Sequence, residues 1–339
     1  MDHKKITVKE LAQKLGVSIS TVSKALNDSY EISDSTKQRV KKLAKEYNYK
    51  PNRLAVNLKS GKTRTIGVIL PSIKNFFFTD VLYGIEQVTN KNDFNIITCF
   101  SNESHEKEVT NTEILSNGSI DGLIVALAEE TQINRQYSHF KDCINEGTPM
   151  VMFDRVAKSI SCDKVVVDDF NDAYLATKHL VDLGCKKLAL VSAIEFLGVG
   201  KARVKGFKKA AEDLLGDQQP QILLNTSVKK LKLEIQDMLD QQKIDGVLAV
   251  DEDSSLAIYS VAKNKGYIIP NDIAIIGYTG KKLAKNISPS LTTINQNGVK
   301  IGKAAAKILI NRMGGKGLDF VTKIIHTNIV QRESTSKKV

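Results

Sequence analysis

From Thr65 onward, short apolar runs alternate with amphipathic stretches that are long enough to form helices. The runs are TIGVILP, NIITCF, GLIVAL, PMVMFD, KLALVS, QILLN, GVLAV and IAIIGY. Continuous apolar runs of this length are typical of strands buried on both faces, and strands separated by helices form parallel βαβ units. The pattern therefore predicts an α/β fold with buried parallel sheet over most of the chain.

The positive charge is concentrated at the N-terminus. Residues 1–64 hold 15 of the 49 lysines and arginines but only six of the 38 aspartates and glutamates, which gives this segment +9. The other 275 residues carry only +2. A small basic module on a nearly neutral body indicates contact with nucleic acid. The alternative, a solvated basic tail, is typical of low-complexity sequence, which this segment is not.

Three short helices are predicted within this basic segment. Thr7 and Glu10 can form a capping box for the first helix, which Gly16 ends. Ser18 can cap the second helix, and the third begins after Ser33. Two helices joined by a turn of about three residues form a helix-turn-helix, whose second helix enters the DNA major groove. A small helical protein-contact domain is the alternative.

The second of these helices would present Ile19, Ser20 and Lys24 outward. Ile19 offers a methyl surface for thymine, and the two polar side chains can hydrogen-bond to base edges. Ser18, Thr21 and Asn27 are better placed for phosphates, which fix the register of the helix on DNA without contacting bases.

A short helix is predicted between the basic segment and the body. Pro51 ends the third helix, Asn52 can cap a new one that carries Leu58, and Gly61 terminates it. A helix of about eight residues is marginal in water. We therefore expect it to be ordered only when another surface covers its leucines.

Three stretches resemble the lactose-repressor (LacI/GalR) family of bacterial transcription regulators: ITVKELAQKLGVSISTVSKALN, ISDSTKQRVKKLAKEYNYKPN and KSGKTRTIGVILP. The resemblance extends to HTNIVQRESTS near the end of the chain. It implies a homodimeric repressor whose affinity for a palindromic operator is controlled by a small molecule, a sugar or sugar derivative. It implies no enzyme activity, no cofactor and no metal.

The resemblance also implies the division of the chain. Residues 1–50 would be the helix-turn-helix domain, 51–64 the hinge, and 65–339 a body of two doubly wound lobes like that of periplasmic binding proteins. The chain would cross between the lobes near Arg155, Asn295 and His326. One lobe would then comprise about 65–154 and 296–325, and the other about 155–295 and 326–335.

By the same resemblance, Ile19, Ser20 and Lys24 stand at base-contacting positions, and Leu58 stands where the family inserts a leucine into the minor groove. Val56 replaces a frequent Arg, so the hinge is expected to make fewer backbone contacts. The full DNA-binding set comprises Thr7, Ser18, Ile19, Ser20, Thr21, Lys24, Asn27, Asn52, Ala55, Leu58 and Lys62.

Effector-binding residues are expected where predicted strands end, since ligands of such sheets bind beyond the carboxyl ends of the strands. Arg203, in RVKGF, matches an arginine that hydrogen-bonds the effector in relatives, and its planar fork suits paired hydroxyls or a carboxylate. The full set comprises Asn75, Phe77, Asp154, Arg155, Arg203, Asp251, Glu252, Tyr278 and Gln296.

Two departures from the family concern the effector. After IIG, relatives usually have an aromatic residue followed by two aspartates, whereas this chain has Tyr278, Thr279 and Gly280. Phe76 replaces a frequent proline. These changes leave open an effector that is less hydroxyl-rich, more apolar or more anionic than a plain monosaccharide.

Two other classes of protein fit the sequence less well. No apolar run approaches the roughly 20 residues that span a bilayer, and MDHKKITVKE lacks the core of a signal peptide. An exported solute-binding protein is therefore not favoured, and we expect a cytoplasmic, nucleoid-associated protein. A dinucleotide-dependent enzyme is not favoured either, because Gly198 and Gly200 lack the G-x-G-x-x-G context.

Other reactive side chains also have simple explanations. Helix capping accounts for the acidic residues at 168–169 and 251–253. The cysteines are widely spaced, and no His or Cys pair has metal-ligand spacing. We therefore expect reduced thiols in the core at Cys99, Cys143, Cys162 and Cys185.

Overall fold

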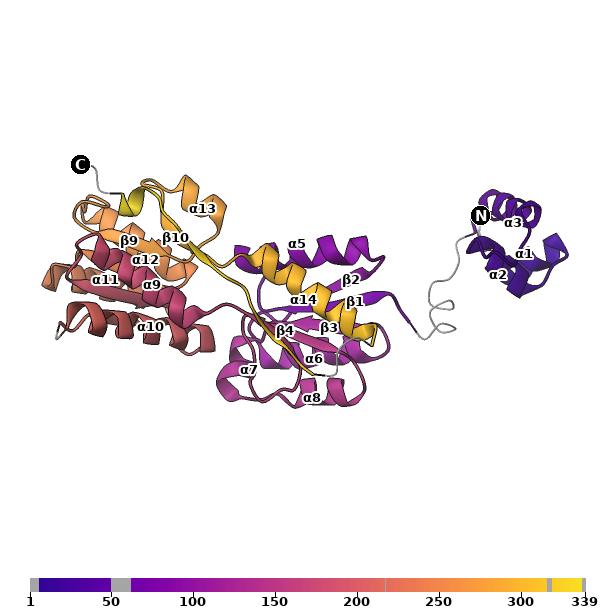
Figure 1. Ribbon diagram of the computed structural model, residues 1–339, viewed down its shortest axis with the longest axis horizontal. Helices are drawn as coiled ribbons and strands as arrows, with labels where there is room; N and C mark the ends of the chain where they lie inside the picture. The colour runs from indigo at the N-terminus through magenta and orange to yellow at the C-terminus, as the bar shows by residue number, and fades with distance from the viewer. Residues whose placement is uncertain (1–5, 50–61, 217, 316–318, 337–339) are drawn as a thin grey trace. The chain divides into compact units, whose positions relative to one another are not determined.

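The computed structural model describes residues 6–49, 62–216, 218–315 and 319–336. The chain forms two compact units, Met1–Thr63 and Arg64–Val339 (Figure 1). The predicted hinge residues Asn52, Ala55 and Leu58 lie outside the described residues, so the hinge helix stays a prediction.

The first unit contains three helices, α1 (Val8–Leu15), α2 (Ile19–Leu26) and α3 (Asp34–Glu46). The predicted caps are confirmed: Thr7 and Glu10 form the capping box of α1, Gly16 ends it in the left-handed conformation, and Ser18 and Ser33 cap the next two helices. The buried core is formed by Leu11, Ala12, Val22, Ala25, Val40 and Ala44. Packing on α1 and α3 therefore compensates for the low helix propensity of α2.

The second unit consists of two lobes, each built on a six-stranded sheet. The sheet of the first lobe has the order β11-β5-β4-β3-β1-β2, and all of its strands are parallel. Its strands are β1 (Thr65–Leu70), β2 (Asn95–Phe100), β3 (Gly122–Val125), β4 (Met150–Phe153), β5 (Asp163–Val166) and β11 (Thr322–Ile324). Side chains from α5 (Phe76–Lys91) and α14 (Gly298–Met313) form the core on one face, and α6 (His105–Ser116) and α8 (Ser138–Asn145) contribute to the other. The short α7 (Glu129–Asn134) contacts α6.

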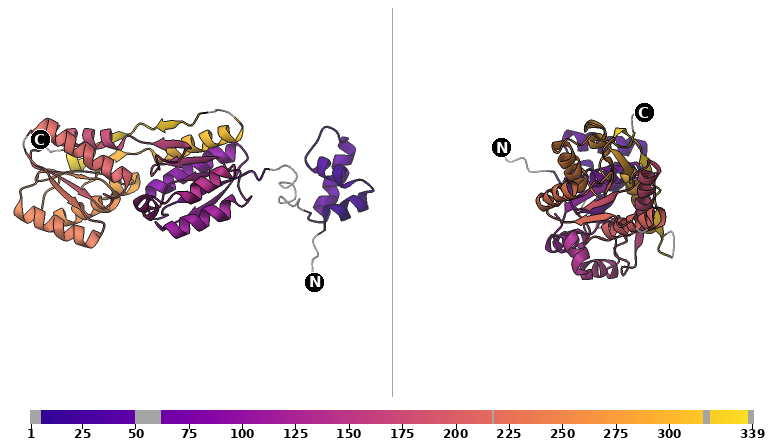
Figure 2. Two further views of the ribbon diagram at one scale, coloured as in Figure 1. Left: turned by 90° about the horizontal axis from the view of Figure 1, so that it is seen from below. Right: turned by 90° about the vertical axis from the view of Figure 1, so that its left-hand side faces the viewer.

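The sheet of the second lobe has the order β12-β10-β9-β8-β6-β7, in which only β12 is antiparallel to its neighbour. Its strands are β6 (Leu188–Ser192), β7 (Gln221–Leu224), β8 (Gly246–Ala249), β9 (Ala274–Gly277), β10 (Thr292–Asn295) and β12 (Asn328–Val330). One face packs on α9 (Asp169–Asp182) and α10 (Gly198–Leu215), and the other on α11 (Val228–Gln241) and α12 (Glu252–Asn264). The short α13 (Lys281–Asn286) follows β9, and η1 (Glu333–Thr335) lies near the end of the chain. Figure 2 shows helices on both sides of each sheet, as the apolar runs predicted.

The predicted crossing near Arg155 is wrong. β5 pairs with β4, so residues 155–166 remain in the first lobe and the chain crosses between β5 and α9. The strand begins with Asp163, which is fully buried and accepts hydrogen bonds from Arg312 Nη2 (2.9 Å) and from the N–H of Val321 (2.9 Å). The strand does not stand out as an apolar run because it begins with a charged residue, whose partners are distant in sequence. The other two crossings lie between β10 and α14 and between β11 and β12.

Three of the four cysteines are buried. These are Cys143, Cys162 and Cys185, whereas Cys99 is half-buried, and all four are thiols rather than disulfides. Over the part of the chain that the structure describes, helices long and apolar enough to cross a membrane are not found.

Backbone contact joins α5 to α14. A Cβ atom added at Gly302 would lie 2.0 Å from the carbonyl oxygen of Val81, and one added at Gly84 would lie 2.2 Å from that of Val299. Neither position can carry a side chain unless the two helices separate. The glycines therefore set the spacing of this helix pair.

We expect Gly302→Ala to lower the free energy of unfolding by about 1–3 kcal/mol, because the added methyl group must displace backbone in a packed interior. Urea denaturation followed by circular dichroism measures the change. Gly314→Ala is the control, since its Cβ would lie 3.4 Å from the nearest atom, the Asn311 carbonyl oxygen. Equal effects of the two substitutions would contradict the close approach.

Candidate functional site

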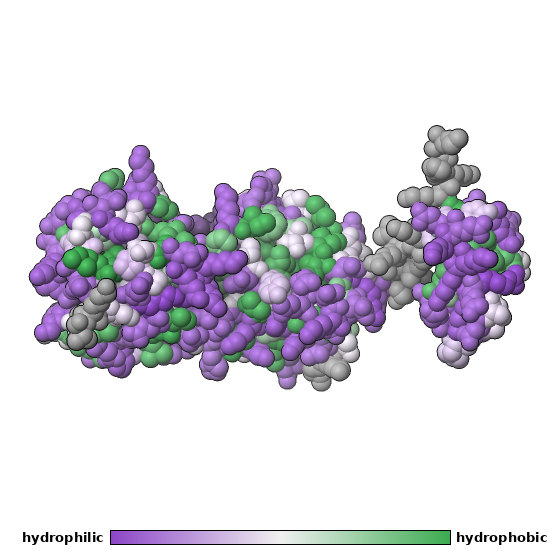
Figure 3. All heavy atoms as spheres, turned by 90° about the horizontal axis from the view of Figure 1, so that it is seen from above, coloured by the Kyte–Doolittle hydropathy of each residue, from purple (hydrophilic) through white to green (hydrophobic). Residues whose placement is uncertain are grey.

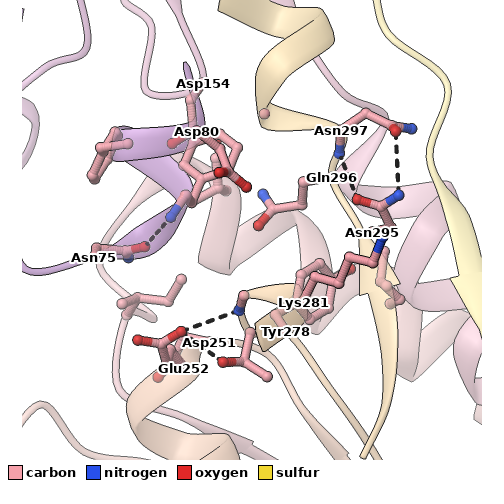
Figure 4. A pocket seen from close by; sticks show the side chains of 18 of the residues that line it. Asn75, Asp80, Asp154, Asp251, Glu252, Tyr278, Lys281, Asn295, Gln296 and Asn297 are labelled. Carbon is pink, nitrogen blue, oxygen red and sulfur yellow. Dashed lines mark hydrogen bonds between the residues drawn. The ribbon is translucent and has the colours of Figure 1, made fainter. Parts of the chain in front are cut away.

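A cavity in the second unit is lined by both lobes (Figure 4). The first lobe contributes the start of α5 and the residues after β4, and the second lobe contributes residues that follow β6, β8, β9 and β10, with one turn of α10. Within each sheet these strands run parallel, so their carboxyl ends lie at one edge, and both edges face the cavity. This geometry places a ligand-sized site where the two sheets face each other.

All nine residues predicted to bind an effector line this cavity. They lie on separate segments of the chain: Asn75, Phe77, Asp154, Arg155, Arg203, Asp251, Glu252, Tyr278 and Gln296. The structure therefore brings the predicted set together. Their contact with a ligand remains a prediction.

Arg203 lines the cavity and is held in place by its own lobe. Its Nε donates to Asp169 Oδ1 (2.8 Å), and its Nη1 donates to the carbonyl oxygen of Val250 (2.6 Å). The guanidinium carbon lies 3.9 Å from the ring centroid of Tyr278, in a cation–π contact. Only 3% of Arg203 is exposed to solvent. Its buried charge is neutralised by the ion pair with Asp169. Its Nη2 also lies 2.7 Å from Asp169 Oδ1. Three of the five N–H groups are thus engaged within the protein, and two are not.

Arg155 is paired in the same way in the first lobe. Its Nη1 donates to Glu103 Oε2 at 2.6 Å, and its guanidinium carbon lies 5.5 Å from the ring centroid of Phe78. Glu103 also accepts a hydrogen bond from the N–H of Glu129 (2.9 Å). Each arginine of the cavity thus has a carboxylate partner from its own lobe.

Asp154 differs from these paired groups. It follows β4 with φ +55°, a left-handed conformation that Asp and Asn adopt more readily than most residues. Among the described residues, no hydrogen-bond donor to its carboxylate was found. Burial raises the pKa of Asp154 to about 6; Asp169 adds to the rise, while Arg155 and Arg203 oppose it.

Two other predicted carboxylates are committed to the second lobe. Asp251 caps α12 by accepting from the N–H of Ser254 (2.8 Å), and its other oxygen accepts from the N–H of Ala193 (2.8 Å). Glu252 accepts from the hydroxyl of Thr279 (2.6 Å) and the N–H of Gly280 (3.2 Å). Helix capping, expected for the acidic residues at 251–253, is confirmed for Asp251. These two side chains shape the cavity wall.

The two predicted amide side chains, Asn75 and Gln296, differ in whether they already have a hydrogen-bond partner within the protein. Asn75 Oδ1 accepts from the N–H of Phe77 (2.9 Å) and caps α5. Gln296 projects into the space between the lobes (Figure 4), and its amide has no partner among the described residues. Gln296 is therefore the best placed of the predicted amides to hydrogen-bond a ligand.

Several lining residues were not predicted. Asp80 lies on the same face of α5 as Phe77, one turn further along, so helical spacing could have found it. Lys281, which follows β9, also lines the cavity. Phe76 packs on Gly280 across the lobes: a Cβ added at Gly280 would lie 3.1 Å from the Phe76 Cβ. The two departures from the family thus meet in space.

The first unit presents the outward face predicted for α2. Ile19, Ser20 and Lys24 are exposed, with 48% of Ile19 accessible. Lys24 forms an ion pair with Glu31, which sequence reasoning did not foresee. Thr7, Ser18 and Asn27 cap helix ends, Thr21 bonds to the Ser18 hydroxyl (2.9 Å), and Lys62 is exposed.

Within the described ranges, groups of three or more His, Cys, Asp or Glu side chains that could hold a metal ion are not found.

Comparison with known proteins gives consistent matches along the chain. The family described as bacterial regulatory proteins, lacI family, matches residues 7–52, and a periplasmic binding protein-like domain matches residues 177–335. The chain is 30% identical to the HTH-type transcriptional regulator RegA of Clostridium saccharobutylicum, covering 97% of this chain and 99% of RegA. It is 29% identical to the ribose operon repressor of Haemophilus influenzae, covering 97% and 98% of the two chains.

The fold is similar to that of the lac repressor dimer bound to operator and an anti-inducer, with a TM-score of 0.85 at 20% sequence identity. The match covers 98% of this chain and 99% of the other. The predicted class, a helix-turn-helix unit followed by a two-lobed body like that of periplasmic binding proteins, is confirmed.

The raised pKa of Asp154 predicts a pH-dependent cost to stability. The folded protein binds this proton more tightly than the unfolded chain, whose carboxyl has a pKa near 3.8, so stability falls as the pH rises from about 4 to about 6. Asp154→Asn removes the charge and keeps the left-handed backbone. We expect it to raise the free energy of unfolding by about 1–2 kcal/mol at pH 7.5 and by much less at pH 4.5. Thermal denaturation at the two pH values measures this, and an equal change at both would contradict it.

Proposed function

The chain belongs to the lacI family of bacterial regulatory proteins, and from that membership we propose that a sugar or sugar derivative, bound between its two lobes, controls its affinity for operator DNA. It is a DNA-binding transcriptional regulator, as its relatives are. The relatives named above are regulators rather than enzymes. Repression is the direction we propose, because the ribose operon repressor matches over almost its whole length.

The convergence of nine predicted residues on one cavity carries this proposal. Three carboxylates, two arginines, two amides and two aromatic rings surround one space. Small-molecule sites combine such polar groups with apolar surface to orient a ligand. Phe77 supplies the aromatic surface, and Gln296 and Asp154 supply hydrogen-bonding groups without internal partners among the described residues.

The DNA contacts that we propose rest partly on the structure of the first unit and partly on the sequence alone. Ile19, Ser20 and Lys24 would contact base edges, with Thr7, Ser18, Thr21, Asn27 and Lys62 at phosphates. Asn52, Ala55 and Leu58 would form the hinge contacts, with Leu58 in the minor groove; sequence alone supports these three. Effector binding would close or twist the two lobes. This movement would alter, through residues 51–64, the pairing of the hinges of two subunits.

A homodimer suits a palindromic operator, because the symmetry of the site matches the symmetry of the protein. Apolar side chains that could form such an interface lie on the first lobe, where Figure 3 shows hydrophobic surface in the middle of the view. Exposed examples are Ile73, Tyr83 and Ile97. Such a dimer would act in the cytoplasm on the bacterial nucleoid.

Lys24→Ala should weaken binding to the preferred operator by about 1–3 kcal/mol and relax base preference at one position of each half-site. The operator is found by selection from random duplexes, and fluorescence anisotropy gives the affinities. Lys62→Ala is the control: it should weaken all sequences alike and reduce the salt slope by about one. Equal losses on operator and random DNA with Lys24→Ala would show that α2 is oriented differently.

Gln296→Ala should weaken sugar binding about tenfold or more, because the amide loses its hydrogen bonds to the ligand while breaking none within the described protein. Thermal shift with a sugar panel identifies a ligand, and calorimetry compares the variants. Gln241→Ala, at the exposed end of α11, is the matched control. Unchanged sugar affinity in Gln296→Ala would show that Gln296 does not contact the ligand.

Gln296 is a better probe than Arg203. Removing Arg203 would leave Asp169 buried without its partner, and breaking such a pair costs about 3–5 kcal/mol. An Arg203→Ala protein could therefore lose its response through unfolding alone.

A further inference from the structure

The charges around Asp154, where the two lobes meet at the cavity, do not balance. Two arginines and three carboxylates lie together there: Arg155, Arg203, Glu103, Asp169 and Asp154. Arg155 is paired with Glu103 (2.6 Å) and Arg203 with Asp169 (2.7 Å). The two pairs are neutral, so one negative charge remains, on Asp154.

Asp154 lies open to the cavity without a partner of its own. It lines the cavity, and the described residues offer its carboxylate no hydrogen bond and no ion pair within bonding distance. Asp172, which interacts electrostatically with Arg203, adds to the negative charge and is 7% exposed. Its Oδ1 accepts from the Thr327 hydroxyl, and its Oδ2 has no partner in the described structure. A charge in this position is stabilised only by protonation or by a cation from outside.

We propose that the effector carries a protonated amine, which forms an ion pair with Asp154, on a hydroxylated, sugar-like frame. This inference rests on the proposed function, since it names the class of ligand for the same cavity. An ammonium supplies the missing counterion and up to three N–H donors. Hydroxyls of the same molecule would bond to Gln296 and to the free N–H groups of Arg203.

The same charge count disfavours an anionic effector, one of the alternatives that the sequence left open. A phosphate or carboxylate needs cations that are not already neutralised, and both arginines of the cavity are paired. Lys281 also lines the cavity, but it is exposed to solvent and belongs to the second lobe. The charge of Lys282 opposes the rise in the pKa of Asp80 that burial causes. An anionic group beside the two arginines would meet the charge on Asp154 instead.

Matched sugars test the proposal. Calorimetry with the full-length chain at pH 7.5, in a buffer free of Tris, compares glucose, galactose and mannose with their 2-amino-2-deoxy, 2-N-acetylamino and 6-phosphate forms. We expect one amino sugar to bind about 10–100-fold more tightly than its parent, since hydrogen bonds to charged groups are the strong ones. N-acetylation, which removes the charge and keeps the frame, should abolish the gain, and the phosphate should bind most weakly.

Asp154→Asn should bring the ratio of amino to parent affinity to about one, whereas the matched Asp253→Asn should leave it unchanged. Asp253 is an exposed carboxylate on α12 that does not line the cavity. Tighter binding of a parent sugar or a phosphate would overturn the amine inference and leave the proposed function standing. Binding of none of these sugars at about 10 mM would contradict the proposed sugar class itself, and the inference with it.

Discussion

Three passages of the chain between the two sheets join the lobes of the second unit and determine which strand ends face each other. Because the strands that end at the cavity are parallel, their carboxyl ends meet, and the polar loops beyond them face one another. The crossings are bonded together: the Thr327 hydroxyl donates to Asp172 Oδ1, and Asn297 Nδ2 donates to the carbonyl oxygen of His326 (2.7 Å). Residues 295–298, the passage between β10 and α14, line the cavity, so a ligand there lies against one of the crossings.

The cavity walls are built largely from side chains that also hold the fold. Asp251 caps a helix, Glu252 orders the turn after β9, and Arg203 is tied to Asp169 and to the backbone after β8. Such groups are pre-organised, so little conformational freedom is lost when a ligand binds. The groups without internal bonds, chiefly Asp154 and Gln296 in the described residues, are left to distinguish one ligand from another.

The sequence predicted the lining of the cavity better than its electrostatics. Motif spacing and strand ends indicated Arg203, Asp154 and Gln296, each of which follows a strand or matches a local pattern, and all three line the cavity. The partners of the arginines carry no such signal: Asp169 is 34 residues from Arg203, and Glu103 is 52 residues from Arg155. β5 was missed for the same reason, since the neutralisation of Asp163 depends on distant residues. The charge of the effector could be argued only once these pairs were known.

The central claim is that one molecule in the cavity and one operator on the first unit are coupled through the state of the two lobes. Coupling free energies are reciprocal, so the measurement is the affinity of each partner in the presence and absence of the other. The account predicts that the ligand changes the operator dissociation constant by the same factor, about 5–150-fold, by which operator DNA changes the ligand dissociation constant. A ligand that binds the cavity equally well with and without operator would contradict it.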